Sequence, residues 1–178
     1  MLRKILRYLL ITFAFLMGIG FLLPGKTHFE RQMGISAPIH VVYNQVNELK
    51  NWPNWSRWYE LDPTAKMVYS SPASAGLGAW YTWDGDKKTV GTGKLTILEA
   101  DSAKLLRCKL VFGDNSESFA DFKLTATDSI STKVVWTFDT DHGLNPAARW
   151  FGLIMEGYLS PDFEKGLAKL KTVCETPK

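Results

Sequence analysis

Apolar residues near the end of the chain recur every three or four positions, which is typical of an amphipathic α-helix. Ser160 is a good N-cap and Pro161 fits the first helical position. We therefore expect a helix over residues 160–174 that needs an apolar surface to lie on. Its buried stripe is Phe163, Leu167, Leu170 and Cys174.

From Lys66 onward the pattern changes to alternation of apolar and polar residues, which is typical of half-buried strands. Asp84-Gly85 is a strong hairpin signal, and Gly91 and Gly93 predict a sharp bend or a close approach within one strand. The short turns between the segments predict an antiparallel meander that can curl around a helix. The expected strands are residues 66–69, 79–83, 90–99, 104–112, 117–127 and 132–139.

One strand and two more helices are expected outside the meander. Residues 27–35 alternate as a first strand, and Pro38 then opens a helix whose stripe begins at Ile39. Residues 147–159 follow Pro146 and are apolar on most sides, so we expect a mostly buried helix there. The alternative is a helix with one face toward a cavity or a membrane surface.

Three tryptophans at three-residue spacing, Trp52, Trp55 and Trp58, predict a short, distorted helical turn. Two interpretations of these indoles remain open. They cap the end of the core, or one or two of them reach a ligand cavity.

The N-terminal segment contains an uncharged run from Tyr8 to Leu23. As a helix this run covers roughly 24 Å of a ~30 Å hydrocarbon core. We expect an uncleaved, single-pass membrane anchor at residues 1–25, followed by one domain at residues 26–178. The basic cluster of Arg3, Lys4 and Arg7 predicts a cytoplasmic N-terminus and an extracytoplasmic domain, periplasmic in a Gram-negative cell. A cleaved signal peptide is the alternative.

The composition, 46% hydrophobic and 13% aromatic, is sufficient for one domain with a real core. The net charge of +3 comes from the N-terminal basic cluster. The remaining residues are neutral, so we expect no nucleic-acid partner. Cys108 and Cys174 fall on apolar faces and are interpreted as buried thiols, with a disulfide as the alternative.

The sequence offers little catalytic chemistry. His28 and His40 are expected to be solvated, and His142 follows Asp139 and Asp141 in what we interpret as a polar loop. Neither a nucleophile paired with a base nor a known catalytic motif is apparent. We therefore expect no catalytic residue, no metal and no cofactor, and the sequence leaves open whether the protein is an enzyme.

Five segments together resemble one group of proteins. They are M-G-I-S-A-P-I-H-V-V-Y-N-Q-V at 33–46, N-W-P-N-W-S-R-W at 51–58, Y-T-W-D-G-D-K-K at 81–88, V-G-T-G-K-L-T-I at 90–97 and D-F-E-K-G-L-A-K-L-K at 162–171. The group is the bacterial polyketide cyclase/dehydrase and lipid-transport proteins of the START-related (SRPBCC) superfamily. The resemblance covers nearly all of the chain from Phe29, but the anchor is not part of the family pattern.

This resemblance implies an α+β helix-grip fold, in which a curved antiparallel sheet wraps around the C-terminal helix and leaves a deep hydrophobic cavity. It does not imply one activity. Our hypothesis is a membrane-anchored protein that holds a lipid or other hydrophobic small molecule in that cavity, with the loop at residues 70–78 as a gate. The candidate ligand-binding residues are Trp58, Tyr81, Trp83, Trp136 and Met155.

Two alternatives remain open at this point. The first is a cyclase or dehydratase that acts on an apolar substrate in the same cavity. The second is a domain without a ligand that docks onto a membrane-protein partner through an aromatic surface at residues 52–58.

Overall fold

The computed structural model describes residues 1–113 and 116–176, and within them seven strands form one antiparallel sheet. The order across the sheet is β1-β7-β6-β5-β4-β3-β2, so the first strand pairs with the last and the others follow as a meander. The expected alternation of buried and exposed residues holds along parts of these strands, but three consecutive residues are buried in β6 and in β7. The strands are β1 (Lys26–Ile35), β2 (Lys66–Tyr69), β3 (Trp80–Asp84), β4 (Thr92–Asp101), β5 (Leu105–Phe112), β6 (Glu117–Ala126) and β7 (Thr132–Asp141).

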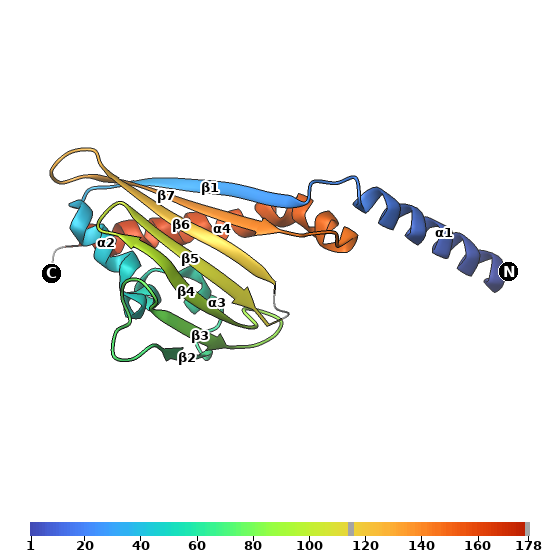
Figure 1. Ribbon diagram of the computed structural model, residues 1–178, viewed down its shortest axis with the longest axis horizontal. Coiled ribbons are helices and arrows are strands. Elements are labelled where there is room, and N and C mark those ends of the chain that lie inside the picture. The colour runs from blue at the N-terminus through green and yellow to red at the C-terminus, as the bar shows by residue number, and fades with distance from the viewer. Residues whose placement is uncertain (114–115, 177–178) are drawn as a thin grey trace.

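The helices of the described residues gather against one face of this sheet, except for the first helix, which projects away from it (Figure 1). The last helix, α4, runs along the sheet, and the short helices between β1 and β2 lie beside it. This arrangement is the expected helix-grip fold. The helices are α1 (Leu2–Gly20), α2 (Ile39–Asn47), the 3-10 helix η1 (Leu49–Asn54), α3 (Arg57–Leu61) and α4 (Pro146–Glu175).

The core lies between the inner face of the sheet and the C-terminal half of α4. The ring of Phe163 packs against the indole of Trp136, with their centroids 4.1 Å apart. Gly166 permits this close approach, because a Cβ atom there would lie 3.2 Å from Cζ3 of Trp136. The expected stripe of α4 is buried as predicted: Phe163, Leu167, Leu170 and Cys174.

The prediction of two separate helices at residues 147–159 and 160–174 is wrong, because α4 is continuous and has Pro161 in its interior. Pro161 has no N–H and so cannot bond to the carbonyl of Gly157. Ser160 is buried rather than capping, and its hydroxyl accepts a hydrogen bond of 2.6 Å from Nη2 of Arg31. The same guanidinium pairs with Glu156 and Glu164, one on each side of the proline, so β1 holds the helix together at its weak point.

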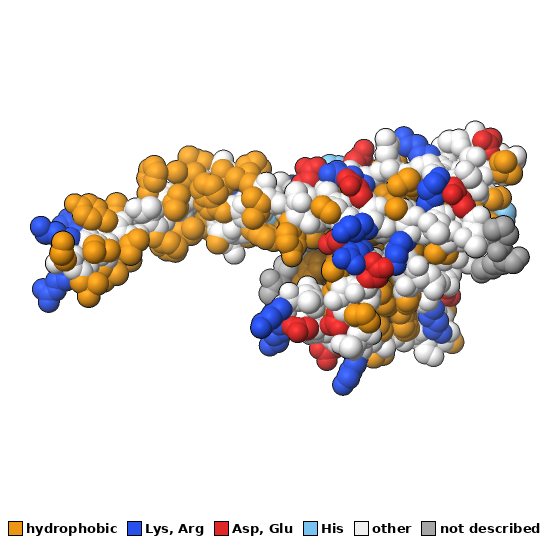
Figure 2. Space-filling view, turned by 180° about the vertical axis from the view of Figure 1, so that it is seen from behind, with side chains coloured by type: hydrophobic (Ala, Val, Ile, Leu, Met, Phe, Trp, Pro, Cys, Tyr) orange, Lys and Arg blue, Asp and Glu red, His pale blue; other side chains and the backbone are white. Residues whose placement is uncertain are grey.

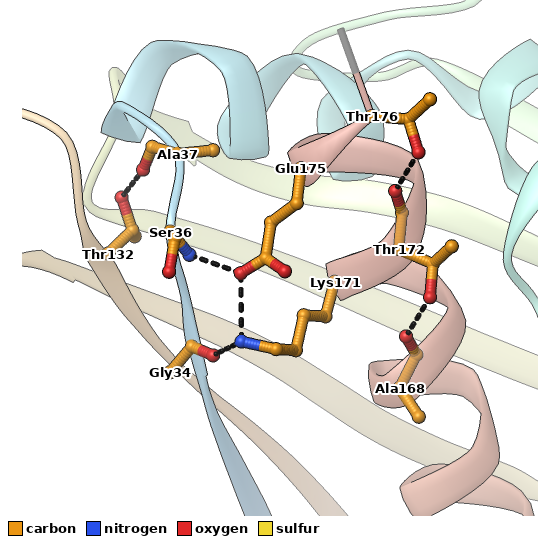
Figure 3. Close-up of polar contacts among 9 residues, drawn as sticks. All are labelled: Gly34, Ser36, Ala37, Thr132, Ala168, Lys171, Thr172, Glu175 and Thr176. Carbon is orange, nitrogen blue, oxygen red and sulfur yellow. Dashed lines mark hydrogen bonds and ion pairs between the residues drawn. The ribbon is translucent and has the colours of Figure 1, made fainter.

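The C-terminal end of α4 is fixed to the end of β1 (Figure 3). Nζ of Lys171 donates to the carbonyl of Gly34 at 2.9 Å and to the carboxylate of Glu175 at 2.8 Å. The same carboxylate oxygen accepts from the backbone N–H of Ser36 at 2.5 Å. These bonds join the helix to the segment that leads from β1 into α2.

No helix in residues 1–113 and 116–176 is long and apolar enough to cross a membrane. Helix α1 includes Arg3, Lys4 and Arg7 and ends at Gly20 rather than continuing through Leu23. Its uncharged part therefore spans only about 20 Å. The prediction of a single-pass membrane anchor, with a cytoplasmic N-terminus and an extracytoplasmic domain, is wrong.

Among the described residues, helix α1 packs against the start of α4 with its own C-terminal end. Nε1 of Trp150 donates to the carbonyl of Leu16 at 2.9 Å, and Nη1 of Arg149 donates to that of Phe21 at 2.7 Å. Gly20 lies directly against Pro146, where a side chain would not fit. Figure 2 shows the rest of the helix as an arm of exposed hydrophobic side chains with basic residues at its free end.

The variant Glu175→Gln is expected to melt at a lower temperature than the parent protein at about pH 7. Hydrogen bonds from Lys171 and Ser36 hold the pKa of the Glu175 carboxyl below its ordinary value. A lowered pKa stabilises the fold above the ordinary value, and this contribution is lost as the pH falls through the folded-state pKa. The difference in Tm should therefore shrink below about pH 4, as measured by circular dichroism.

The matched control is Glu30→Gln, because among the described residues no hydrogen bond or ion pair reaches that exposed side chain. It should leave Tm unchanged at both pH values. Equal effects of the two substitutions would show that the contact between Glu175 and β1 adds nothing to stability.

Candidate functional site

A cavity of about 310 Å³ lies between α3, α4 and the inner face of the sheet. Residues of β3 to β7 form its floor, Trp52 of η1 and residues of α3 form one side, and α4 forms the other. The lining residues are Trp52, Trp58, Tyr59, Leu61, Asp62, Ala65, Met67, Tyr81, Trp83, Thr89, Val90, Leu95, Leu110, Phe112, Ala120, Trp136, Phe138, Tyr158, Leu159, Asp162 and Phe163. Its surface is therefore mostly aromatic and aliphatic.

Four of the five predicted site residues lie on this wall: Trp58, Tyr81, Trp83 and Trp136. The indole of Trp58 stands edge-on to the indole of Trp136 and to the phenyl ring of Phe163, at centroid distances of 5.8 and 5.6 Å. Met155 lies on α4, partly buried against the core, and is not among the lining residues.

Two glycines, Gly91 just before β4 and Gly93 within it, show why the indole of Trp83 lies against the strand. Gly93 is the cross-strand partner of Trp83, and a Cβ atom at Gly93 would overlap the indole ring. Gly91 has φ of +59°, which turns the chain into β4, and Nε1 of Trp83 donates to the carbonyl of Val90 at 3.0 Å. The close approach predicted from these glycines is confirmed.

The three spaced tryptophans serve both of the roles that the sequence left open. Trp55 is fully buried in the core, and its Nε1 donates to the carbonyl of Gln45 at 3.1 Å. Trp52 is 3% exposed, donates to the carbonyl of Val46 at 2.8 Å, and lines the cavity together with Trp58. Because Trp52 and Trp55 are buried, they do not form the exposed aromatic surface that the docking alternative requires.

Both carboxylates in the wall are already engaged. Asp62 accepts hydrogen bonds from Oγ1 of Thr64 at 2.7 Å and from the N–H of Asp86 at 2.7 Å, and these bonds lower its pKa. Asp162 pairs with Nε of Arg57 at 3.4 Å. No Lys, Arg or His of the described residues lines the cavity. The cavity therefore presents no free charge of either sign to a guest.

Two tyrosines, the buried Tyr81 and the half-buried Tyr59, contribute phenol groups to the wall. The hydroxyl groups of Tyr59 and Tyr69 are hydrogen-bonded at 2.9 Å. Burial is the main cause that raises the pKa values of Tyr59 and Tyr81 above the ordinary value for tyrosine. Both phenols therefore stay protonated at any physiological pH.

The sequence analysis missed several residues of the cavity wall. Some of them could have been found from a sequence pattern, and others could not. Tyr59 directly follows Trp58, so the aromatic cluster could have been extended by one residue. Phe163 belonged to a stripe that the helical period assigns to the core, and it lies in the core and in the wall at once. Ala120 and Leu110 have no signal, because strand alternation predicts only that they point inward.

Other polar groups of the domain lie outside the cavity wall. Oγ1 of Thr27 lies 2.9 Å from Nε2 of His142, whose pKa is lowered mainly by burial. Arg107 and Asp121 form a two-point ion pair on the outer face of the sheet, with contacts of 3.0 and 2.8 Å. Within residues 1–113 and 116–176, no group of three His, Cys, Asp or Glu side chains is placed to hold a metal ion.

The two cysteines are free and buried, which confirms their interpretation as buried thiols. Burial raises the pKa of Cys108, and it raises that of Cys174 to about 11. Neither thiol lines the cavity.

Solved structures with the same fold are numerous, and the following three share little sequence with this chain. A protein of Chromobacterium violaceum is 12% identical over 85% of this chain and 99% of its own, with a TM-score of 0.59. A truncated norcoclaurine synthase from Thalictrum flavum is 13% identical over 85% of this chain and 96% of its own, also with a TM-score of 0.59. The Aha1 dimer from Colwellia psychrerythraea is 13% identical over 85% of this chain and 98% of its own, with a TM-score of 0.59. At these identities the likeness shows the fold alone.

A comparison with curated protein sequences gives no match. The model of one protein family, described as polyketide cyclase / dehydrase and lipid transport, matches residues 26–175. This match spans the whole sheet, the short helices and α4, including every residue of the cavity wall. The chain therefore belongs to the polyketide cyclase/dehydrase and lipid transport family.

Proposed function

We propose that residues 26–178 form one binding unit, which holds a lipid or another hydrophobic small molecule in the cavity between the sheet and α4. The observation that carries this proposal is the mostly apolar space of about 310 Å³ between the sheet, α3 and α4. It lies at the lower end of the range for small-molecule sites, which are mostly apolar with a few polar groups that orient the guest. Trp58, Tyr81, Trp83 and Trp136 would form the contact surface.

The polar groups of the wall favour binding over turnover. Acid–base or nucleophilic catalysis needs a free group with a partner beside the guest. Asp62 accepts hydrogen bonds from N–H and O–H donors, Asp162 pairs with Arg57, and the phenols of Tyr59 and Tyr81 are held in their protonated form. We therefore place the protein with the carriers rather than with the cyclases.

The guest would enter where the wall reaches the surface. Tyr158 of α4 is 72% exposed, and Thr89 of the β3–β4 turn is also exposed, and both residues line the cavity. We call this opening, between the α3–β2 turn, the β3–β4 turn and Tyr158, the mouth. Asp62 fixes its width, because its carboxylate joins the α3–β2 turn to the backbone of the β3–β4 turn.

The loop at residues 70–78 is a poorer gate than the sequence suggested. The carbonyl of Ser74 accepts from the N–H of Leu49 at 2.9 Å, and its hydroxyl donates to Glu48 at 2.5 Å. The N–H of Gly76 donates to Oδ1 of Asn47 at 3.1 Å. Opening this loop would break all of these bonds, whereas a guest at the mouth displaces only exposed side chains.

Filling the cavity is expected to abolish most of its binding capacity. Ala120 lies on the floor, 4% exposed, so Ala120→Leu would place the added carbon atoms inside the void. Titration of the full chain with the neutral fluorophore N-phenyl-1-naphthylamine should show saturable binding to the parent protein. The variant should bind at least about tenfold more weakly, a loss of roughly 1.4 kcal/mol.

The matched control is Ala126→Leu, which makes the same change at an exposed position of the same strand. It should bind the fluorophore like the parent protein, and both variants should melt cooperatively. An absence of binding to the parent protein, or equal binding by Ala120→Leu, would contradict the proposed function.

Cutting the tie across the mouth is expected to loosen the β3–β4 turn. In Asp62→Ala, the amide of Asp86 loses its hydrogen-bond acceptor, so its hydrogen exchange should accelerate and the bound fluorophore should dissociate faster. Because hydrogen bonds lower the folded-state pKa of Asp62, the tie is present above the ordinary pKa and is lost as the pH falls through the lowered one. Hydrogen exchange by mass spectrometry and stopped-flow fluorescence measure the two effects.

Asp84→Ala serves as the control, because Asp84 is exposed and ends β3 next to the same turn. It should change neither the exchange of the Asp86 amide nor the dissociation rate. Unchanged exchange in Asp62→Ala would mean that the turn is held by its own backbone bonds and that Asp62 does not control the mouth.

A further inference from the structure

Several polar groups in the cavity wall have a partner within the protein. The indole N–H groups of Trp52 and Trp83 donate to backbone carbonyls, and Oγ1 of Thr89 donates to the carbonyl of Asp86. The two carboxylates are engaged as described above, and the hydroxyl of Tyr59 is bonded to that of Tyr69. These groups are unavailable to a guest unless an existing bond breaks.

Among the described residues, no hydrogen bond reaches the polar atom of four wall side chains: Trp58, Tyr81, Trp136 and Tyr158. Tyr158 is exposed and Trp58 is half-buried, so burial distinguishes Tyr81 from these two. Its side chain is buried, 7% exposed, and its hydroxyl forms no hydrogen bond with any residue in 1–113 or 116–176. The hydroxyl is also not sealed between protein atoms, unlike the equally unpaired Nε1 of Trp136. A buried, unpaired phenol that remains accessible on a cavity wall is open to the cavity itself.

The position of Tyr81 is fixed by its neighbours. It lies in β3, paired with Tyr69 of β2 and Leu95 of β4. Its ring is 5.9 Å from those of Trp52 and Trp83, which hold it from two sides. A tyrosine has few rotatable bonds, so this packing presents the hydroxyl to a guest at low entropic cost.

The hydroxyl acts there as a donor. Burial raises the pKa of Tyr81, so the O–H proton is retained. The wall offers no free cation to attract an acid and no free carboxylate to attract an amine, so charged guests gain nothing to offset their desolvation. The guest that suits this unpaired donor is therefore one with a neutral oxygen, which can accept a hydrogen bond from the hydroxyl of Tyr81.

We propose that Tyr81 is a specificity-determining residue, whose hydroxyl donates a hydrogen bond to a neutral acceptor oxygen of the bound molecule. The site thereby distinguishes an apolar molecule that carries a carbonyl from the hydrocarbon of the same shape. This inference rests on the proposed function, because it requires a guest in the cavity.

The test uses two rigid probes with the same tricyclic skeleton, 9-fluorenone, which has one carbonyl, and fluorene, which has none. Each competes with N-phenyl-1-naphthylamine for the full chain and for Tyr81→Phe. The variant should bind 9-fluorenone about five- to tenfold more weakly and fluorene as the parent does, since one hydrogen bond to a neutral acceptor is lost. Tyr43→Phe removes a phenol hydroxyl from α2, outside the cavity wall, and should change neither affinity.

A second readout does not depend on the variant. The infrared carbonyl stretch of bound 9-fluorenone should lie at a lower wavenumber than in hexane, and it should return toward the hexane value in Tyr81→Phe. An unshifted stretch in the parent protein overturns the inference even if the variant fails to fold.

The remaining outcomes separate the two proposals. If Tyr81→Phe weakens both probes equally or neither of them, or if neither probe displaces the fluorophore, the inference about Tyr81 is wrong and the binding function stands. If the fluorophore itself does not bind the parent protein, the proposed function fails, and the inference fails with it.

Discussion

The contact between α4 and the β1 side of the sheet determines where space is left in this molecule. Phe163 and Gly166 let the helix approach Trp136 closely, and Arg31 and Gly34 of β1 hold it at its proline and at its C-terminal end. The helix therefore lies over one side of a wide, curved sheet. The inner face of β3 to β6 is covered instead by η1 and α3, whose large rings bridge the gap without filling it. The cavity follows from this uneven cover.

The rings around the cavity are held by bonds that do not involve a guest. The indoles of Trp52, Trp55 and Trp83 each donate to a backbone carbonyl, so their orientations are fixed by the chain itself. Interiors normally pack to crystal-like density, and flexible side chains would collapse into a void of this size. Rigid aromatic groups with tethered N–H atoms resist such collapse. A site built in this way is largely preformed, and a guest pays little to organise it.

Local patterns predicted the parts of this fold whose physics is local. Alternation located every strand because each inward residue meets the same core, and Gly93 marked the place where an indole lies on a strand. The continuity of α4 was not predictable, since Ser160 and Pro161 form a good helix start, and only the distant Arg31 outweighs that signal. The apolar run in α1 was wrongly predicted to cross a membrane, because the prediction did not count the three basic residues that fall inside the helix. No sequence periodicity predicts the cavity itself, because a void depends on how helices and strands pack against one another.

Two unpaired polar groups in the aromatic core illustrate how structure and binding differ. Nε1 of Trp136 is sealed, and the rings of Trp55 and Trp58 stand edge-on around its indole at 5.7 and 5.8 Å. A sealed donor costs stability whether or not a guest is bound, and weak contacts with neighbouring π-systems compensate only part of that cost. The hydroxyl of Tyr81 is unpaired but open to the cavity, so a guest oxygen can satisfy it. The first group is a consequence of packing α4 onto aromatic residues. The second makes the affinity of the site depend on the chemistry of its guest.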